Sequence, residues 1–467
     1  MMNTDYLIVG AGAAGMVFAD QLLTETAARI VIADRGAKPG GHWNEAYSFV
    51  RLHQPAAFYG AGSRDLGPPR LETAGFNRGL YELASGGVVA SYFDSIMRER
   101  FLPSGRVTYL PMTEHLGGGE LVNRLSGKRQ LVRYRRIVDA TYTQTSIPAT
   151  RPPPYRVAPG VSLVSPNLLP QTAPGRSRFA IIGGGKTAMD AGLWLLEMGA
   201  DPDAIRWVVP RDSWLINRAT VQPGDAFFPR RVEAQAETLE CAARGASPAD
   251  LFQRLEAAGL LLRIDRCVTP TMFRGATVAE AEIEALGRIR DVVRLGRVRG
   301  LQADRIVLER GEVAADPTTL YVDCSASAFG PAPATPVFDG DRITLQMIRA
   351  NLTSFSFAAI AHLEAAYADD ATRNALCPPI PPADSDLDWL RLTIADLETA
   401  GRWSADRDLR RWAGSHRLSG FGGWDKDSDQ ARAIMARMQA ARPLALSNLQ
   451  ALLARSAEVA PDARQAA

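Results

Sequence analysis

Two glycine-rich segments are the parts of this sequence best suited to chemistry, because each follows a short apolar run and precedes a helical one. The first is Gly10-Ala11-Gly12-Ala13-Ala14-Gly15, and the second is Gly183-Gly184-Gly185-Lys186-Thr187-Ala188. Glycines at this spacing let a strand turn sharply into a helix and let a pyrophosphate approach the backbone, where the helix N-terminus offers unpaired N–H donors. The sequence therefore predicts two dinucleotide-binding sites.

The residue that follows the second apolar run of each unit indicates which dinucleotide the unit binds. Residues 30–33 of the first unit lead to Asp34, whose carboxylate can accept hydrogen bonds from both ribose hydroxyls. Because this carboxylate would repel a 2′-phosphate, the first unit is predicted to bind FAD or NAD. Residues 205–209 of the second unit lead to Arg211, whose guanidinium can pair with a 2′-phosphate and favours NADPH. The alternative for Arg211 is a charged residue on a surface turn.

Strands and helices must hold these loops in place. The runs at 6–9, 30–33, 179–182 and 205–209 are β-branched and aliphatic, as in strands buried in a parallel sheet. Residues 148–174 are rich in proline and are expected to link the two units. From residue 384 onward we expect helices. Four tryptophans in that part either cap a substrate pocket or belong to the core: Trp389, Trp403, Trp412 and Trp424.

Composition excludes several classes of function. A chain of 467 residues is long enough for two or three domains. Its 53 Lys and Arg against 51 Asp and Glu give a net charge of +2, which predicts no general attraction for nucleic acid or an anionic membrane. The 4 cysteines are far apart and the 5 histidines lack metal-ligand spacing, so we expect neither disulfides nor a metal site. No apolar run is long enough to span a membrane, and we expect a cytoplasmic protein.

The residues after Asp34 distinguish FAD from NAD. Gly40-Gly41-His42-Trp43, followed by Tyr47 and Arg51-Leu52-His53-Gln54-Pro55, resembles the GGxW segment of the flavin-containing and Baeyer–Villiger monooxygenases, which runs beside the isoalloxazine ring in that family. The resemblance covers roughly residues 5–365. It implies an α/β fold with two Rossmann-like dinucleotide-binding domains, in which an NADPH domain interrupts the FAD domain, and a helical C-terminal region follows.

The same resemblance implies the limits of the domains. We expect residues 1–150 and 318–383 to form the FAD-binding domain, 175–317 the NADPH-binding domain and 384–467 the helical region. Two runs of apolar and then small residues, 137–141 and 322–326, are expected to return strands to the FAD domain.

The resemblance also implies an activity: an FAD-dependent, NADPH-consuming monooxygenase that acts on a small organic molecule. Such an enzyme uses O₂ and a C4a-peroxide of the flavin to oxygenate a nitrogen, a sulfur or a carbonyl carbon, and a homodimer is the oligomeric state that the family suggests. Two alternatives stay open. One is an FAD- and NADPH-dependent dehydrogenase or reductase without oxygenation, and the other is an FAD-binding protein without turnover.

The residues predicted to bind cofactors follow from the two loops and from the resemblance. For FAD they are Gly10, Gly12, Ala14, Gly15, Asp34, Arg35, Gly41, His42, Trp43, His53, Gln54, Thr141 and Gln346. For NADPH they are Gly183, Gly185, Lys186, Thr187 and Arg211, although Lys186 could equally be a solvated helix residue. The predicted catalytic residues are His53, by its position, and Arg211. In Baeyer–Villiger members an arginine near this strand end reaches the flavin, and Arg218 is the other candidate for that role.

The sequence departs from the family at two places. The fingerprint FxGxxxHSxxF has its nearest match at Ala158-Pro159-Gly160, Val164-Ser165 and Leu168, so valine replaces the histidine and both aromatic residues are missing. The asparagine that many members hold near the reactive flavin carbon has no counterpart, and His53 or Gln54 occupies that neighbourhood. The missing histidine is the observation that favours the dehydrogenase or reductase alternative.

Overall fold

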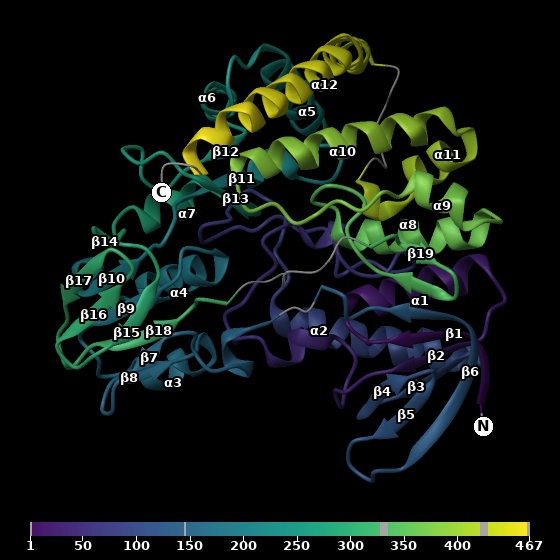
Figure 1. The fold of residues 1–467 in the computed structure, drawn as a ribbon, viewed down its shortest axis with the longest axis horizontal. Coiled ribbons are helices and arrows are strands. Elements are labelled where there is room, and N and C mark those ends of the chain that lie inside the picture. Colours follow the sequence, from purple (N-terminus) through teal and green to yellow (C-terminus); the bar gives the residue numbers. More distant parts are fainter. Residues whose placement is uncertain (1, 144–145, 327–334, 421–427, 465–467) are drawn as a thin grey trace.

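A mainly parallel sheet near the N-terminus carries the first glycine loop (Figure 1). The protein is described by a computed structural model that covers residues 2–143, 146–326, 335–420 and 428–464. The strand order is β19-β20-β6-β1-β2-β3, and β5 and then β4 continue from β6 as antiparallel strands. The strands are β1 (Met2–Val9), β2 (Ile30–Ala33), β3 (Val107–Leu110), β4 (Thr113–Gly117), β5 (Glu120–Asn123), β6 (Arg129–Asp139), β19 (Phe338–Asp339) and β20 (Arg342–Thr344).

Both faces of this sheet are covered, which explains the unbroken apolar runs in β1 and β2. On one face, Ile8 and Ile32 pack under the helices α1 (Ala13–Glu25) and α8 (Thr353–Ala366). On the other face, Leu7 and Val31 pack against Leu121 of β5. A strand buried on both faces has no polar alternation, and this is the pattern that the sequence predicted.

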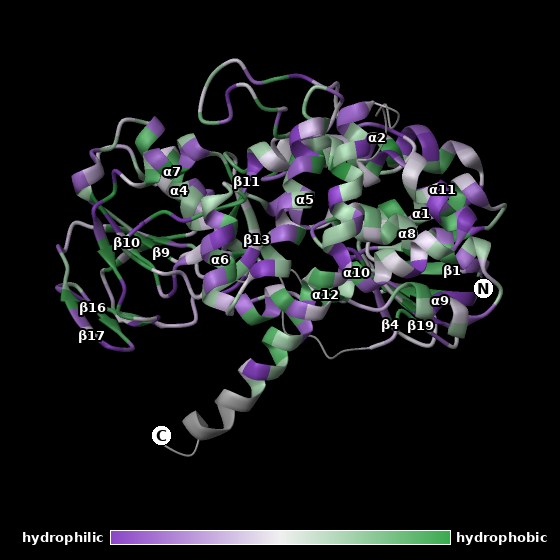
Figure 2. Cartoon of the chain, turned by 90° about the horizontal axis from the view of Figure 1, so that it is seen from above, coloured by the Kyte–Doolittle hydropathy of each residue, from purple (hydrophilic) through white to green (hydrophobic). Residues whose placement is uncertain are grey.

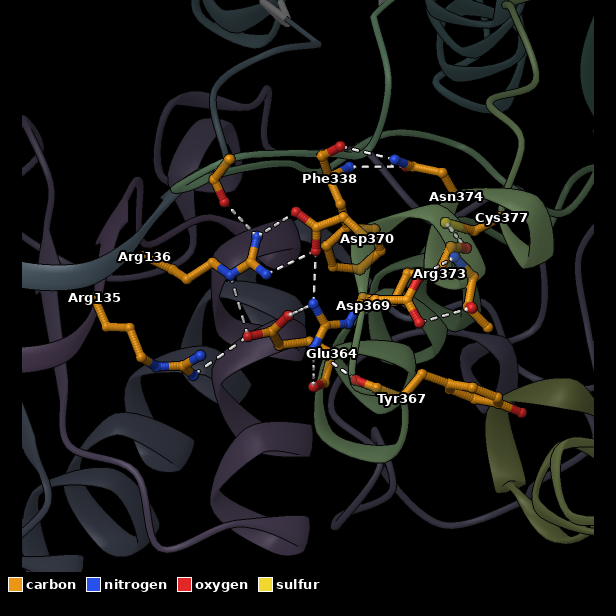
Figure 3. Close-up of polar contacts among 12 residues, drawn as sticks. Arg135, Arg136, Phe338, Glu364, Tyr367, Asp369, Asp370, Arg373, Asn374 and Cys377 are labelled. Atoms are coloured by element: carbon orange, nitrogen blue, oxygen red, sulfur yellow. Dashed lines mark hydrogen bonds and ion pairs between the residues drawn. The ribbon is translucent and has the colours of Figure 1, made fainter.

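A buried carboxylate ties α8 to the sheet (Figure 3). The side chain of Glu364 is 0% exposed and lies 3.5 Å from Nε of Arg136 on β6 and 3.4 Å from Nη1 of Arg373 on α9 (Asp370–Leu376). The hydroxyl of Tyr6 on β1 also donates a hydrogen bond of 2.8 Å to Glu364. Arg136 is held in turn by Asp370, at 2.7 Å. Because removal of one partner leaves a buried charge uncompensated, this network fixes the C-terminal end of α8 against the sheet.

A second, fully parallel sheet carries the second glycine loop. Its order is β14-β10-β9-β18-β8, from the strands β8 (Ser162–Val164), β9 (Phe179–Ile182), β10 (Ile205–Val208), β14 (Asp291–Val293) and β18 (Leu320–Asp323). Helix α4 (Lys186–Glu197) follows β9, and α7 (Glu280–Leu286) precedes β14. Figure 2 shows β9 as hydrophobic, whereas the surrounding helices carry residues of both kinds.

One expected strand lies in the other sheet. Residues 322–326 were expected to return to the FAD domain, but β18 pairs with β8 and β9 in the second sheet, with Leu320 opposite Phe179. All of β18 is buried. An apolar run of this kind fits the centre of either parallel sheet, so its composition could not specify the partner strand. The return to the first sheet is made by β20 instead, which pairs with β6.

The proline-rich stretch 148–174 is more than a linker. It supplies β8 and also β7 (Arg156–Val157), which is the edge of a sheet ordered β17-β16-β15-β7. The other strands of that sheet are β15 (Val298–Leu301), β16 (Arg305–Leu308) and β17 (Gly311–Ala314), and the helix α3 (Leu169–Thr172) follows β8. Leu301 and Ile306 of the small sheet pack on Ala180 and Val208, so the small sheet covers one face of the second parallel sheet.

A third body joins the segment between β10 and β14 to the C-terminal helices. The segment contributes the sheet β12-β11-β13 and the helices α5 and α6 to this body, and the helices α10, α11 and α12 come from the C-terminal part. Trp389 packs on Phe252 with ring centroids 5.5 Å apart. The elements are β11 (Ser213–Asn217), β12 (Leu261–Leu262), β13 (Met272–Val278), α5 (Phe228–Arg244), α6 (Pro248–Ala257), α10 (Asp386–Ala405), α11 (Arg407–Ser415) and α12 (Asp429–Arg464).

The C-terminal tryptophans are packing residues in the described part of the chain. Trp403 and Trp412 lie against Phe355 of α8, with ring centroids 5.9 and 5.6 Å from that of Phe355. The C-terminal helices therefore also pack on a helix that covers the first sheet. Trp424 lies outside the described residues. Across residues 2–143, 146–326, 335–420 and 428–464, no helix combines the length and the apolar character that crossing a membrane requires. The predicted fold class, with two Rossmann-like units and a helical C-terminal region, is confirmed.

Candidate functional site

The first glycine loop joins β1 to α1 and leaves backbone N–H groups free. Gly12 is the N-cap residue of α1 and provides no side-chain cap, and the first turn of the helix has no acidic residue. A Cβ on Gly15 would overlap the carbonyl oxygen of Gly10, so only glycine permits this approach of helix and strand. The carboxylate of Asp34, just after β2, accepts a hydrogen bond from the backbone N–H of Ala11. An anion-binding helix end and a carboxylate therefore lie side by side.

The Gly40–Trp43 segment lies on this loop. The N–H of Gly40 donates to the carbonyl oxygen of Ala11 at 2.8 Å. A Cβ on Gly41 would come within 2.9 Å of the Cα of Gly12. The rings of His42 and Trp43 follow at once, with centroids 5.1 Å apart, and burial lowers the pKa of His42. Two segments that are thirty residues apart in sequence thus form one surface.

Other predicted FAD residues surround the loop or lie apart from it. Thr141 lies beside Gly10, and its N–H and hydroxyl both donate to Asp139, at 2.9 and 2.8 Å. Ala14 is part of the first turn of α1, whereas Arg35 is exposed. Gln346 is buried, and its amide donates to the carbonyl oxygen of Thr335 at 2.9 Å, so that group already has a partner in the protein.

The start of α8, where the resemblance places the last FAD-contacting helix, contains an unpartnered polar group. Ser354 is 1% exposed, and its hydroxyl has no hydrogen-bond partner among the described residues. The N-cap residue of α8, Leu352, offers no side-chain hydrogen bond. Gln54 reaches this region, because its amide donates to the carbonyl oxygen of Asn351 at 3.1 Å. The loop after Trp43 and the start of α8 therefore meet.

His53 is held in one protonation state by its surroundings. The backbone N–H of Thr277 on β13 donates to Nδ1 of His53 at 3.3 Å, which places the proton of the neutral ring on Nε2. Burial, and then the charges of Lys186 and Arg218, lower the pKa of His53 to about 4. At neutral pH His53 can donate a hydrogen bond from Nε2, but it has no additional proton to give.

Arg218, the second candidate for an arginine that reaches the flavin, has its donors occupied inside the protein. It is 0% exposed and lies 2.7 Å from Glu282 on α7. It also donates to the carbonyl oxygens of His53 and Thr277, at 3.1 and 3.0 Å, and to Asn77, at 3.1 Å. Arg218 therefore positions the His53 segment against β13 and α7. In the sequence, Arg218 was a candidate only because it lies a few residues after Arg211.

The second glycine loop repeats the features of the first. Gly183 has φ +133°, and a Cβ there would lie 2.5 Å from the carbonyl oxygen of Cys324 after β18. Gly185 is the N-cap residue of α4 without a side-chain cap, and nothing lies within 4 Å of the position of its absent Cβ. The start of α4 therefore has no side-chain cap, and the space beside Gly185 is open.

Two polar residues that follow this loop are engaged by protein groups. Lys186 forms ion pairs with Asp190 on α4 and, at 3.6 Å, with Glu282. Thr187 shares a hydrogen bond with Tyr47, whose hydroxyl also donates to Asp190 at 2.7 Å. Burial and the nearby Asp190 raise the pKa of Tyr47. Lys186 is thus a partner of buried carboxylates, which neither of its two predicted roles included.

Arg211 lies next to the second loop, since a Cβ on Gly184 would be 3.0 Å from its carbonyl oxygen. Its guanidinium binds the carboxylate of Asp384, at 2.7 and 2.8 Å, and Arg274 of β13 binds the same carboxylate. Although burial opposes the effect, these hydrogen bonds lower the pKa of Asp384. Sequence reasoning missed Arg274 and Asp384, because they are 63 and 173 residues from Arg211 and belong to no motif. In the described part of the chain no group of His, Cys, Asp and Glu could hold a metal ion.

Comparison with known proteins supports the fold and identifies relatives of the chain. Residues 8–61 match the family model of an NAD(P)-binding Rossmann-like domain. The uncharacterized protein Rv2000 of Mycobacterium tuberculosis (strain H37Rv) is 51% identical over 419 residues, which cover 90% of this chain and 78% of that protein. Mb2023 of Mycobacterium bovis is similar to the same extent. The open crystal structure of cyclohexanone monooxygenase has a TM-score of 0.50 at 12% identity and covers 94% of this chain and 98% of its own. That likeness is one of fold.

Proposed function

The chain belongs to the same family as the mycobacterial protein Rv2000 and has the fold of a flavin monooxygenase, and on this premise we propose that it is an FAD-dependent oxidoreductase that consumes NADPH. The observation that carries the proposal is the pairing of two helix ends without side-chain caps, one beside the carboxylate of Asp34 and the other beside the backbone of Arg211, whose guanidinium pairs with Asp384. The first suits a dinucleotide with free ribose hydroxyls, and the second suits one with a 2′-phosphate.

The first site fits FAD. The N–H groups at the start of α1 would bind the pyrophosphate, Asp34 the ribose hydroxyls, and Gly41 and Thr141 would border the chain between the two. At the far end, the buried hydroxyl of Ser354 lacks a partner within the described residues and could donate to a polar edge of the ring. When bound, FAD supplies the redox chemistry, since it takes a hydride from a nicotinamide and passes electrons to an acceptor.

The second site fits the hydride donor. The first-turn N–H groups of α4 would bind its pyrophosphate above Gly185, where the space around the glycine is open. Arg211 lies where the 2′-phosphate of NADPH would reach. Between the two sites, Arg218 and Thr277 hold His53 in place, and the Nε2–H of His53 is available as a neutral donor.

Within this class we propose a monooxygenase for a small organic molecule, oxygenated at nitrogen, sulfur or a carbonyl carbon. The overall reaction consumes NADPH, a proton and O₂, places one oxygen atom in the substrate and releases the other as water. A neutral His53 supports this proposal, because it has no acidic proton to release at neutral pH. Oxygenation by a flavin requires a site with few acids. We expect the chain to act as a homodimer, as the resemblance suggests.

The dehydrogenase or reductase alternative is favoured by one observation. The fingerprint histidine is replaced by Val164, which is the last residue of β8 and pairs with Val322 in the second sheet. That position is therefore occupied by a strand residue without acid–base chemistry. If this difference decides the reaction, electrons pass from NADPH through FAD to an organic acceptor and no oxygen is inserted.

One set of spectra separates these possibilities. The purified protein is examined for a flavin spectrum, titrated anaerobically with NADPH and with NADH, and then mixed with O₂ in a stopped-flow instrument. Bleaching by NADPH supports an enzyme, and a flavin that NADPH leaves oxidised would identify a binding protein without turnover. An oxygen adduct that precedes reoxidation supports a monooxygenase, whereas direct reoxidation supports the reductase. A protein that neither contains nor takes up flavin would refute the proposal.

A further inference from the structure

Three charged residues from distant parts of the sequence meet at the end of β10. Arg211 follows β10, Arg274 lies in β13 and Asp384 precedes α10. One nitrogen of Arg211, Nη2, donates to both oxygens of Asp384, at 2.8 and 2.7 Å. Arg274 approaches the same carboxylate with Nε, at 2.8 Å, and with Nη2. Two guanidinium groups therefore converge on one anionic group.

One member of this cluster, Arg211, lies next to the second glycine loop. Gly184 of the loop contacts the backbone of Arg211 and the side chain of Val209, with 3.0 and 3.1 Å from the position of a Cβ on the glycine. In the first unit Asp34 directly follows β2 and lies against the loop, and Arg211 lies at the corresponding strand end, two residues beyond Val209, the direct counterpart of Asp34. The two arginines thus lie where the substituent on the ribose of a dinucleotide would be recognised.

The ion cluster is open enough to exchange one anion for another. The side chains of Arg211, Arg274 and Asp384 are 34%, 42% and 47% exposed. Ion pairs at this exposure are weak, because water screens them and the side chains lose mobility. A phosphate dianion carries a larger charge and three acceptor oxygens, so it binds two guanidinium groups more strongly than one carboxylate does.

The neighbouring carboxylates do not compete for this place, because each has other partners. Asp212 lies 2.9 Å from Arg294. Asp388 accepts hydrogen bonds from the backbone of Asp384 and Ser385 and pairs with Arg391 at 2.7 Å. If Asp384 withdraws, Arg211 and Arg274 are left with two positive charges to face a ligand.

We propose that Arg211 and Arg274 form a two-arginine clamp for the 2′-phosphate of NADPH, and that Asp384 is an internal counter-ion which occupies the clamp until the phosphate displaces it. The inference rests on the proposed use of NADPH, and it adds a second recognition residue and a gate from the C-terminal region. NADH lacks the phosphate and cannot displace Asp384, so the counter-ion sharpens the choice between the two nicotinamides. Because Asp384 adjoins the N-cap residue of α10, Ser385, binding of NADPH also breaks the ion pairs that join the start of α10 to Arg211 and Arg274.

The clamp is tested with two fragments that differ only by the phosphate, 2′,5′-ADP and 5′-AMP. Their affinities for the holoprotein are measured by isothermal titration calorimetry in the wild type, in Arg274→Gln and in Asp384→Asn. The control is Arg178→Gln. Arg178 also pairs with an aspartate, Asp316 at 3.2 Å, but it precedes β9 and therefore lies at the opposite end of the strands of the same sheet. Thermal unfolding of each variant shows whether it is folded.

We expect Arg274→Gln to weaken 2′,5′-ADP binding about tenfold or more, the fold-change that corresponds to one lost charge-assisted contact. Asp384→Asn should strengthen it by roughly three- to tenfold, since the phosphate no longer displaces a charge. Binding of 5′-AMP should change less than about twofold in both, and Arg178→Gln should match the wild type for both fragments. Equal loss of both fragments in Arg274→Gln, or unchanged 2′,5′-ADP binding in both clamp variants, would overturn the clamp.

The failure of the clamp is distinguishable from failure of the proposed function. If NADPH reduces the bound flavin in all variants but the phosphate contributes nothing to affinity, the enzyme is an oxidoreductase and the clamp is wrong. If neither fragment binds the wild type and no nicotinamide reduces the flavin, the proposed function fails and the clamp fails with it.

Discussion

Replacement of Gly185 by alanine should weaken the binding of NADPH at the second glycine loop without lowering the stability of the protein. Gly185 has φ −93° and ψ −177°, which alanine adopts, and no atom lies within 4 Å of where its Cβ would stand. Alanine is a poorer N-cap residue than glycine, but it reduces the entropy of the unfolded chain. These effects offset each other, so we expect the free energy of unfolding to change by no more than about 0.5 kcal/mol.

The same methyl group should obstruct a pyrophosphate. If it keeps the phosphate from one or two backbone N–H groups of α4, the loss is about 1.5–3 kcal/mol, the worth of a hydrogen bond to a charged group. This corresponds to a roughly 10- to 150-fold increase in the Kd of NADPH. The assay is an anaerobic titration of the flavin spectrum with NADPH, together with urea denaturation of the same preparation.

The matched comparison is Gly183→Ala. Gly183 has φ +133°, and its Cβ would collide with the backbone of Cys324, so that variant should lose about 1–3 kcal/mol of unfolding free energy. Gly185→Ala should therefore lose affinity and keep stability. A Gly185→Ala protein that is fully stable and binds NADPH with wild-type affinity would refute the assignment of this loop to the pyrophosphate.

Three further predictions concern other parts of the molecule. Asp34→Ala should weaken retention of FAD about tenfold or more, measured as flavin content after gel filtration, because the ribose loses its acceptor. His53→Gln should flatten the fall in stability between pH 6.5 and 4. A buried histidine with a lowered pKa takes up a proton on unfolding, so the free energy of unfolding falls with pH in this window, by roughly 3 kcal/mol at most for this residue. Glu364→Ala should cost about 3–5 kcal/mol in urea denaturation, because Arg136 and Arg373 lose a buried partner.

Each of these has an outcome that contradicts it. Unchanged flavin content in Asp34→Ala would mean that the carboxylate serves only the loop N–H groups that it already binds. Stability profiles of His53→Gln and wild type that stay parallel from pH 6.5 to 4 would show that His53 is not held neutral in the folded state. A stable Glu364→Ala protein would mean that Asp370 alone compensates Arg136.

Local patterns in the sequence specified the glycine loops and their strands. The spacing in residues 10–15 and 183–188 depends on contacts between residues that are a few positions apart, such as Gly15 against Gly10, so the pattern carries the geometry. The resemblance in Gly40–Trp43 likewise pointed to a segment that lies on the first loop. These parts of the fold and site could be predicted.

Contacts between distant segments could not be predicted. Arg274 and Asp384 meet Arg211 because β13 and the segment before α10 join the same body, and neither has a motif. The pairing of Arg218 with Glu282 has the same origin. Strand β18 was assigned to the wrong sheet, since four buried residues in a row suit the middle of any parallel sheet. Such choices depend on tertiary packing, which composition does not encode.

The measurement that tests the central claim most directly is the anaerobic reduction of the purified protein's own flavin by one equivalent of NADPH. We predict one FAD per chain, loss of the oxidised flavin absorption after a single equivalent, and much slower or weaker reduction by NADH. A colourless protein that does not take up FAD, or a flavin that stays oxidised in excess NADPH, would contradict the assignment of the two loops to two dinucleotides that exchange a hydride.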